Sequence, residues 1–232
     1  MRVLAFLLAA ALAAPTAALE LLPTTLQLPV AGGRTELWLH NSGPDAWQGQ
    51  VQVLAWDQQL DAEQLQPSDR ILASPTRLEL APGGRQRIWL LPRDPGPVVS
   101  EQAYRIILVP ARKDLPRYSL PLFQGLAAPQ ARIQLRARLE AGSSQQMLRL
   151  SNPGTLHGRL HDLRFTSADG KRSLLQPDLA GYILAGRERR WALPARGDGY
   201  AGGRFQARLQ DGREVELDTA DPPIAVSAAS GL

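Results

Sequence analysis

The sequence has no cysteine, few aromatic residues and almost no lysine. The absence of Cys from all 232 residues excludes disulfide frameworks, thiolate zinc sites and cysteine nucleophiles. Aromatic residues make up 6% of the chain, too few for an evident platform on which bases or sugars could stack. Of the 26 basic residues, all but Lys113 and Lys171 are arginine, yet the formal net charge is only +4. Because the arginines are dispersed among acids and glutamines, nucleic-acid binding is not predicted.

Long apolar runs are also scarce, and the clearest one lies at the N-terminus. Arg2 precedes an apolar run over residues 3–14, and small residues follow up to Ala18. This pattern is typical of a secretory signal peptide, here predicted over residues 1–18 with the mature chain beginning at Leu19. The run of about 12 residues is shorter than the roughly 20 that a transmembrane helix needs. We therefore expect a protein that leaves the cytosol and does not insert into a membrane after signal cleavage.

What the sequence does contain is alternation of apolar and polar residues over short segments. These segments are separated by Gly, Pro, Asn and Asp, whereas helical periodicity is scarce. From Arg132 to Leu139 every second residue is apolar, so one face can pack while the arginine face stays in water. The fold class is therefore predicted to be all-β, built from immunoglobulin-like sandwiches. The clearest predicted strands are Thr35–Leu39, Gln50–Leu54, Arg77–Leu80, Gln86–Leu90, Tyr104–Val109, Arg132–Leu139, Met147–Leu150 and Arg204–Leu209.

Other stretches are interpreted from composition alone. Leu60–Arg70 is polar, rich in Gln and acids, and is predicted to be a long surface connection. Residues 220–232 are rich in Ala, Ser and Pro and are predicted to form a disordered tail. Tryptophans that fall within strand segments are predicted to be core residues rather than ligand stackers. These are Trp38, Trp56, Trp89 and Trp191.

Two sequence features occur in the same order in both halves of the chain. A strand runs into an Asn-x-Gly turn at Asn41 and again at Asn152. Farther on, a glycine turn precedes an arginine-rich strand that contains a tryptophan, once at Gly83 and once at Gly186. This repeat predicts two related β domains, with a boundary where Gly125 and Pro129 interrupt the strand pattern. The predicted domains are residues 19–124 and 125–219.

Motifs that would support catalysis or metal binding are missing from the sequence. His157 and His161 lie four residues apart, but on a strand Arg159 would sit between them and repel a cation. Surface histidines are therefore predicted there rather than a metal site. Neither a Gly-x-Ser-x-Gly nucleophile elbow nor a phosphate-binding loop occurs. We predict no catalytic residue, no metal and no cofactor.

The segment Arg117–Phe123 closes the predicted first domain and has the features of an edge strand. Tyr118, Leu120 and Leu122 alternate on one face, and Pro121 favours an edge because it cannot donate a ladder hydrogen bond. Such a strand can add to the sheet of a partner by main-chain pairing. The residues alone leave a second interpretation equally open, in which an ordinary edge strand is covered by the second domain.

Short segments spread over almost the whole predicted mature chain carry a family resemblance. They are Pro23–Leu26, Leu37–Gly43, Trp56, Ala73–Pro75, Leu80–Leu90, Glu101–Arg105, Arg117–Phe123, Asn152–Gly154 and Leu184–Gly186. In this order they resemble the periplasmic pilus chaperones of the chaperone-usher pathway, particularly a divergent group similar to spore coat and biofilm pilus chaperones. The resemblance rests on the order of the segments rather than on one motif.

The resemblance implies a fold, a location and a function. The fold would be two immunoglobulin-like domains in an L shape with a cleft between them, and the location the periplasm. The last strand of the first domain would complete a pilin subunit that lacks its own final strand, for delivery to an outer-membrane usher. Basic residues of the cleft would hold the C-terminal carboxylate of the pilin. Neither a nucleotide nor a catalytic residue is implied.

Carried over residue by residue, the resemblance assigns a pilin-binding site. Thr25 stands where the family commonly has an arginine, so Arg117 becomes the candidate carboxylate anchor. Residues 109–115 are short and polar where donor strands commonly offer apolar side chains, which favours an unusual subunit or an accessory role. The alternative function is a secreted structural or adhesion module that donates no strand. The side chains assigned to the donor strand are Tyr118, Leu120 and Leu122.

Overall fold

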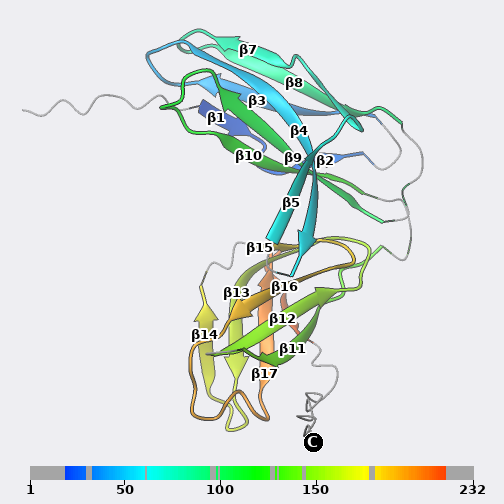
Figure 1. The fold of residues 1–232 in the computed structure, drawn as a ribbon, viewed down its shortest axis with the longest axis vertical. Helices are drawn as coiled ribbons and strands as arrows, with labels where there is room; N and C mark the ends of the chain where they lie inside the picture. Colours follow the sequence, from blue (N-terminus) through cyan, green and yellow to red (C-terminus); the bar gives the residue numbers. More distant parts are fainter. Residues whose placement is uncertain are drawn as a thin grey trace, which may run out of the picture.

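The computed structural model describes residues 19–29, 33–60, 62–94, 98, 100–125, 129, 131–142, 145–177 and 181–217. Within these ranges the chain is built from β-strands, which confirms the predicted all-β class, and no helix there could span a bilayer. The strands form two sandwiches that follow one another along the chain (Figure 1). The predicted signal peptide and the predicted tail lie outside the described residues.

The first sandwich packs a sheet of order β1-β3-β8-β6 against a sheet of order β2-β10-β9-β4-β5, in which β7 also pairs with β4. Alternating apolar residues such as Leu37 and Leu39 of β3 and Ile106 and Leu108 of β9 fill the space between the sheets. The strand bounds are β1 (Leu19–Leu22), β2 (Leu26–Leu28), β3 (Thr35–Asn41), β4 (Trp47–Gln59), β5 (Ala62–Pro67), β6 (Ile71–Ser74), β7 (Arg77–Leu80), β8 (Arg85–Pro92), β9 (Gln102–Pro110) and β10 (Tyr118–Gln124).

The second sandwich packs a sheet of order β11-β12-β16 against one of order β14-β13-β17-β18, in which β15 also pairs with β13. Leu148 and Leu150 of β12 and Phe165 of β13 are fully buried between them. The predicted domain boundary falls between β10 and β11. The strand bounds are β11 (Arg136–Ala141), β12 (Gln146–Asn152), β13 (Gly158–Thr166), β14 (Arg172–Gln176), β15 (Gly181–Ile183), β16 (Arg187–Ala192), β17 (Arg204–Leu209) and β18 (Glu214–Glu216).

The two repeated sequence features lie in contact in each domain. In the first domain the backbone N–H of Gly83 donates to the carbonyl of Asn41 at 2.8 Å, and in the second the N–H of Gly186 donates to the carbonyl of Asn152 at 2.8 Å. Gly83 and Gly186 have φ values of 70° and 68°, in the left-handed region that glycine adopts without steric cost. Each buried asparagine amide also donates to one backbone carbonyl of its own turn and to another at the end of a strand distant in the chain. The repeat therefore reflects the same local structure, formed once in each domain.

One predicted strand is shorter than the sequence pattern suggests. The alternation that begins at Arg132 becomes a strand only at Arg136, the start of β11. Before that point the backbone bonds to the turn that follows β12, because the carbonyl of Arg132 accepts from Thr155 and the N–H of Gln134 donates to Asn152 Oδ1 at 3.2 Å. The apolar face was nevertheless predicted correctly, since Ile133 packs on the second core.

The predicted surface connection over Leu60–Arg70 is wrong, because Ala62–Pro67 forms strand β5. It pairs antiparallel with the second half of β4, from Leu54 opposite Pro67 to Gln59 opposite Ala62. Most of its side chains are exposed, so the segment lacks the apolar alternation that marks a half-buried strand. The resulting hairpin projects from the first domain to the second, as Figure 1 shows.

The tryptophans differ in burial, so their common prediction as core residues is only partly right. Trp56 is 4% exposed, whereas Trp38 is 41% exposed on the outer face of β3. Trp89 and Trp191 are half-buried. The guanidinium of Arg87 lies over both Trp38 and Trp89, at 5.1 and 4.1 Å from their ring centroids. The arginine thus covers part of both rings in a favourable cation–π arrangement.

Candidate functional site at the domain junction

The two domains meet through a small aromatic cluster built from distant parts of the chain. Trp56 comes from β4, Phe123 from β10 and Tyr182 from β15, and their ring centroids lie 5.4 to 6.0 Å apart. The ring of His157, just before β13, stacks on Phe123 at a centroid distance of 3.6 Å. Leu184 completes the cluster. We call these five residues the junction cluster.

His157 was predicted to be a surface histidine, and the structure corrects this. Its side chain is 17% exposed, and its Nδ1 lies 2.6 Å from Oε2 of Glu101, a carboxylate that is 4% exposed. The backbone N–H of His157 donates to the same oxygen at 2.7 Å. Burying a carboxylate is costly unless it is hydrogen-bonded, so this contact fastens the second domain to the residue that precedes β9.

The β4–β5 hairpin makes further polar contacts across the junction. Gln58 is 2% exposed; its Nε2 donates to the carbonyl of Tyr182 at 2.8 Å, and its Oε1 accepts from the N–H of Leu184 at 2.9 Å. This amide therefore pairs with the backbone of β15 as a neighbouring strand would. At the tip of the hairpin the carbonyl of Leu60 accepts from the N–H of Arg190 at 3.1 Å, which covers part of the edge of β16.

An ion pair between Asp57 of β4 and Arg187 of β16 also joins the domains. Burial would raise the pKa of Asp57, but hydrogen bonds from Arg187 and from the backbone of Gln58 lower it below its ordinary value. Both residues line a polar cavity of about 460 Å³ between the domains. These contacts hold the two domains together, so the side chains at the junction are already in place before any partner binds.

Arg105 of β9 lies against the junction cluster. Its guanidinium carbon lies 3.7 Å from the ring centroid of Trp56 and 6.0 Å from that of Tyr182, and its side chain is 15% exposed. Burial lowers the pKa of Arg105, while the nearby carboxylate of Glu63 opposes this effect. The arginine nevertheless keeps its charge, because the ordinary pKa of a guanidinium is far above neutrality.

A second arginine approaches the same tyrosine from the other domain. Arg159 of β13 lies opposite Tyr182 in the sheet, with its guanidinium carbon 5.3 Å from the ring centroid. Its Nε is buried without a hydrogen-bond partner in the described part of the chain, and so is the Nε1 of Trp56. Buried N–H donors without acceptors are uncommon in native proteins and need an explanation. We call Arg105, Arg159, Trp56 and Tyr182 the junction site.

The chemistry of the junction site suits a carboxylate. It offers two guanidinium groups, one from each domain, and an indole N–H, and these three groups can donate hydrogen bonds but cannot accept them. Arginine binds carboxylates through paired hydrogen bonds, and partial burial strengthens such bonds relative to water. Within the described residues no group of three or more His, Cys, Asp or Glu side chains converges as metal ligands would.

Strand β10 runs into the junction with one edge half open. On one side it pairs with β9 over its whole length, from Tyr118 to Gln124. On the other it pairs with β2 only from Leu122 to Gln124, in parallel orientation. Among the described residues, the outer edge from Tyr118 to Pro121 has no strand neighbour. A strand from another chain could pair there.

The side chains assigned to the donor strand point into the core of their own domain. Leu120 and Leu122 are 4% and 0% exposed, and Tyr118 packs against the same cluster. Its hydroxyl accepts a hydrogen bond from the N–H of Leu19 at 3.3 Å. A partner strand would therefore meet the backbone of this edge, and the role of these three side chains in binding stays a prediction.

The other two predicted site residues lie apart from the junction site. Arg117 is exposed and precedes β10, at the end of the strand opposite to Phe123, which contacts the second domain. Thr25 is half-buried just before β2, whose first residue pairs with Leu122. The structure thus does not bring Arg117 to the junction, and its predicted role as an anchor remains untested.

The sequence patterns missed Arg105 and Arg159 for the same reason. Each occupies an alternate position of a half-buried strand, where an arginine normally faces water. Their neighbours in space, Trp56 and Tyr182, are more than 40 and 20 residues away in the chain, respectively. One sequence signal pointed to Arg105, because it is the last residue of Glu101–Arg105, a segment that carries the family resemblance.

Solved structures show what this arrangement of strands is similar to. A chain of the CsuC–CsuE chaperone–tip adhesion subunit pre-assembly complex, from the archaic chaperone-usher Csu pili of Acinetobacter baumannii, is 20% identical, with 88% of this chain and 100% of that chain covered and a TM-score of 0.73. The chain has the fold of a pilus chaperone. No protein-family model matches it. A search of curated proteins likewise finds no match.

Two further solved chaperones share the fold at lower similarity. The CupB2 chaperone of Pseudomonas aeruginosa is 14% identical, with 87% of this chain and 100% of that chain covered and a TM-score of 0.56. The Escherichia coli chaperone DraB is 17% identical, with 88% and 97% covered and a TM-score of 0.57. The predicted tandem of immunoglobulin-like sandwiches is confirmed, and so is the resemblance to pilus chaperones at the level of the fold.

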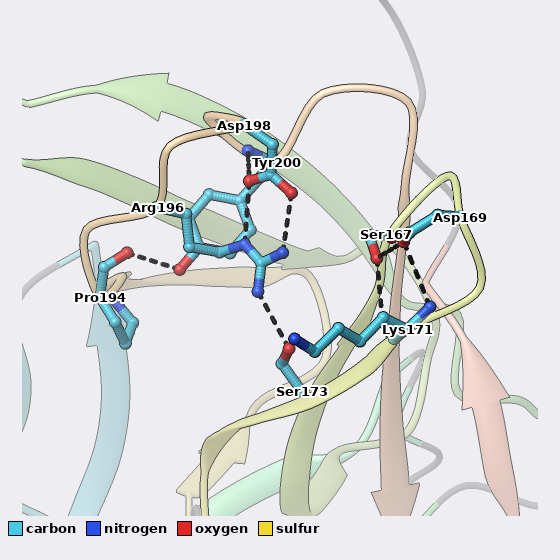
Figure 2. Close-up of polar contacts among 8 residues, drawn as sticks. All are labelled: Ser167, Asp169, Lys171, Ser173, Pro194, Arg196, Asp198 and Tyr200. Atoms are coloured by element: carbon cyan, nitrogen blue, oxygen red, sulfur yellow. Dashed lines mark hydrogen bonds and ion pairs between the residues drawn. The ribbon is translucent and has the colours of Figure 1, made fainter.

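Away from the junction, a polar cluster lies in the connection from β16 to β17 (Figure 2). Arg196 donates from Nε and Nη2 to the two carboxylate oxygens of Asp198 at 2.9 and 2.7 Å, and from Nη1 to Ser173 Oγ at 3.0 Å. The hydroxyl of Tyr200 donates to the carbonyl of Pro194 at 2.6 Å. Tyr200 has a φ of 62°, a strained conformation that these contacts hold in place. We therefore interpret the cluster as structural.

The pair formed by Asp198 and Arg196 should make the stability of this fold sensitive to acid. The hydrogen bond from Arg196, assisted by the N–H of Tyr200, lowers the pKa of Asp198 from 3.8 to about 2. A carboxyl group with a lowered pKa stabilises the fold fully above its unfolded pKa and loses this effect as the pH falls through its folded pKa. The excess stability of the wild type over Asp198→Asn should therefore be constant above about pH 4 and decrease between about pH 4 and 2.

Denaturant unfolding of both proteins across this pH range measures the effect. Arg196→Met is the matched control, because removing the partner should remove the same pH-dependent difference. An excess stability that does not change between about pH 5 and 2 would contradict the assignment.

Proposed function

We propose that this protein is a periplasmic chaperone that holds pilus subunits and delivers them to an outer-membrane usher. In this proposal β10 pairs through its open edge with a subunit whose sandwich lacks a strand. Such a subunit exposes a hydrophobic groove and unpaired backbone groups, and a borrowed strand covers both. The similarity to a chaperone–subunit complex of Csu pili supports this proposal. The function requires no catalytic residue and no cofactor.

The observation that carries the proposal is the junction site beside the half-open strand. The buried Nε of Arg159 and Nε1 of Trp56 have no acceptor among the described residues, and β10 passes next to Trp56 through Phe123. A chain end inserted at the junction would supply a carboxylate to these donors. We therefore place the carboxylate anchor at Arg105 and Arg159, in preference to Arg117.

The experiment is co-production in the periplasm with small pilin-like subunits encoded beside the gene for this protein. We expect a 1:1 complex that survives purification, and subunits that aggregate or are degraded when produced alone. A subunit that folds and accumulates equally well without this protein, and forms no complex with it, would contradict the proposal. That result would favour the alternative, a secreted structural module that donates no strand.

A further inference from the structure

Glu63 of β5 is the carboxylate nearest to the centre of the junction site. Its Oε2 lies 3.5 Å from Nη2 of Arg105, and its Oε1 lies 3.7 Å from Nη1 of Arg189 on β16. It stands opposite Gln58 in the hairpin, on the face that carries Trp56. This single carboxylate therefore lies between an arginine of the first domain and an arginine of the second.

These contacts are longer than the tightest ion pairs of the described residues. The bidentate pair of Arg196 and Asp198 has a contact of 2.7 Å, and Arg149 approaches Glu140 at 3.1 Å. Charge-assisted N–H···O bonds are typically about 2.7–2.9 Å long, so Arg105 and Glu63 are not optimally bonded. The side chain of Glu63 is 36% exposed, whereas that of Arg105 is 15% exposed. The carboxylate therefore approaches a largely buried cation from the solvent side.

An uncompensated buried guanidinium is costly, and Glu63 provides compensation in the free protein. The same contact competes with any other carboxylate that approaches Arg105. The hairpin need not move for an exchange, because Gln58 and Leu60 hold it to the second domain through bonds that do not involve Glu63. Only the Glu63 side chain has to rotate, and Arg189 is placed to retain it.

We propose that Glu63 is a placeholder, an internal carboxylate that occupies Arg105 in the free protein and is displaced by the C-terminal carboxylate of a bound chain. This inference rests on the proposed function, since it concerns the same junction site. The placeholder lowers the affinity for the incoming carboxylate, and it re-forms the pair with Arg105 when the bound chain leaves. It therefore makes both binding and release an exchange of one carboxylate for another.

The test compares wild type with Glu63→Gln, which keeps the shape of the side chain and removes its charge. The probe is a synthetic peptide of the last 15 residues of a pilus subunit, prepared with a free C-terminal carboxylate and, separately, with a C-terminal amide. Binding is followed by calorimetry. We expect Glu63→Gln to bind the carboxylate peptide about five- to tenfold more tightly than wild type, as loss of a partly exposed competing ion pair implies. Affinity for the amide peptide should stay the same.

Glu79→Gln is the matched control, an acid of β7 in the same sheet that contacts Gln48 and lies outside the junction site. It should bind both peptides as wild type does. If Glu63→Gln binds the carboxylate peptide no more tightly than wild type does, the placeholder role of Glu63 is wrong. The proposed function still stands in that case, provided that wild type binds the carboxylate peptide. If neither protein prefers the carboxylate peptide to the amide, the anchor at the junction fails, and the placeholder fails with it. Unfolding curves of the variants verify that each is folded.

Discussion

Replacing Arg105 with glutamate should weaken the complex with a pilus subunit by about 100-fold or more, which is roughly 3 kcal/mol. The substitution removes the best-placed guanidinium of the junction site and puts a negative charge where the subunit's carboxylate would bind. It also sets two carboxylates against each other, since Glu63 lies 3.5 Å from the arginine that is lost. The measurement is the amount of subunit that co-purifies with the variant, followed by titration of the purified partners.

Arg117→Glu is the matched control for this experiment, because it reverses the same charge on an exposed residue away from the junction. We expect that variant to retain the complex. Arg105→Gln separates the loss of the cation from the added repulsion and should show an intermediate effect. If Arg117→Glu abolishes the complex while Arg105→Glu retains it, the anchor is where the sequence resemblance placed it and our assignment to Arg105 is wrong.

Replacing Trp56 with alanine should lower the free energy of unfolding by about 3–5 kcal/mol, the range for truncating a buried aromatic residue. Trp56 contacts Phe123 and Tyr182 and supports the guanidinium of Arg105, so its loss removes the centre of the junction cluster. We also expect the two domains to unfold in separate transitions, because the junction cluster is the apolar part of the contact that couples them. Denaturant unfolding followed by circular dichroism measures both effects.

Trp38→Ala provides the control for residue type and size. Trp38 is 41% exposed on the other sheet of the same domain, so its truncation should cost below about 1 kcal/mol. Equal losses for the two variants would show that Trp56 contributes no more than a surface tryptophan. A single unchanged transition for Trp56→Ala would show that the polar contacts of Gln58 and Glu101 suffice to couple the domains.

Much of the architecture followed from the local pattern of residues. The alternation of apolar and polar residues identified β3, β8, β9 and β17, because each of these strands buries one face and leaves the other more exposed to solvent. The sequence repeat could be recognised because a buried asparagine and a left-handed glycine each tolerate few substitutes. These residues are Asn41 and Gly83 in the first domain and Asn152 and Gly186 in the second. Strand β5 was missed because its side chains are mostly exposed, so that backbone pairing, and not burial, holds it in place.

The sequence predicted the candidate site far less well than it predicted the fold. A pattern along one strand shows which face is buried, but it does not show which other strand that face meets. Arg105 looked like an ordinary arginine on a wet face, and its position over Trp56 depends on the pairing of β9 with β4. His157 looked like a surface residue until its ring was found stacked on Phe123, in a contact that exists only because the two domains dock.

The sequence by itself determined the all-β class, the two related sandwiches and the faces of most strands, because each of these depends on neighbours a few residues apart. Only the tertiary structure decided where the arginines converge, which edge of β10 is open and which carboxylate faces Arg105. These depend on strand pairing and domain docking between residues far apart in the chain, such as Trp56 and Tyr182, and no local pattern records such contacts.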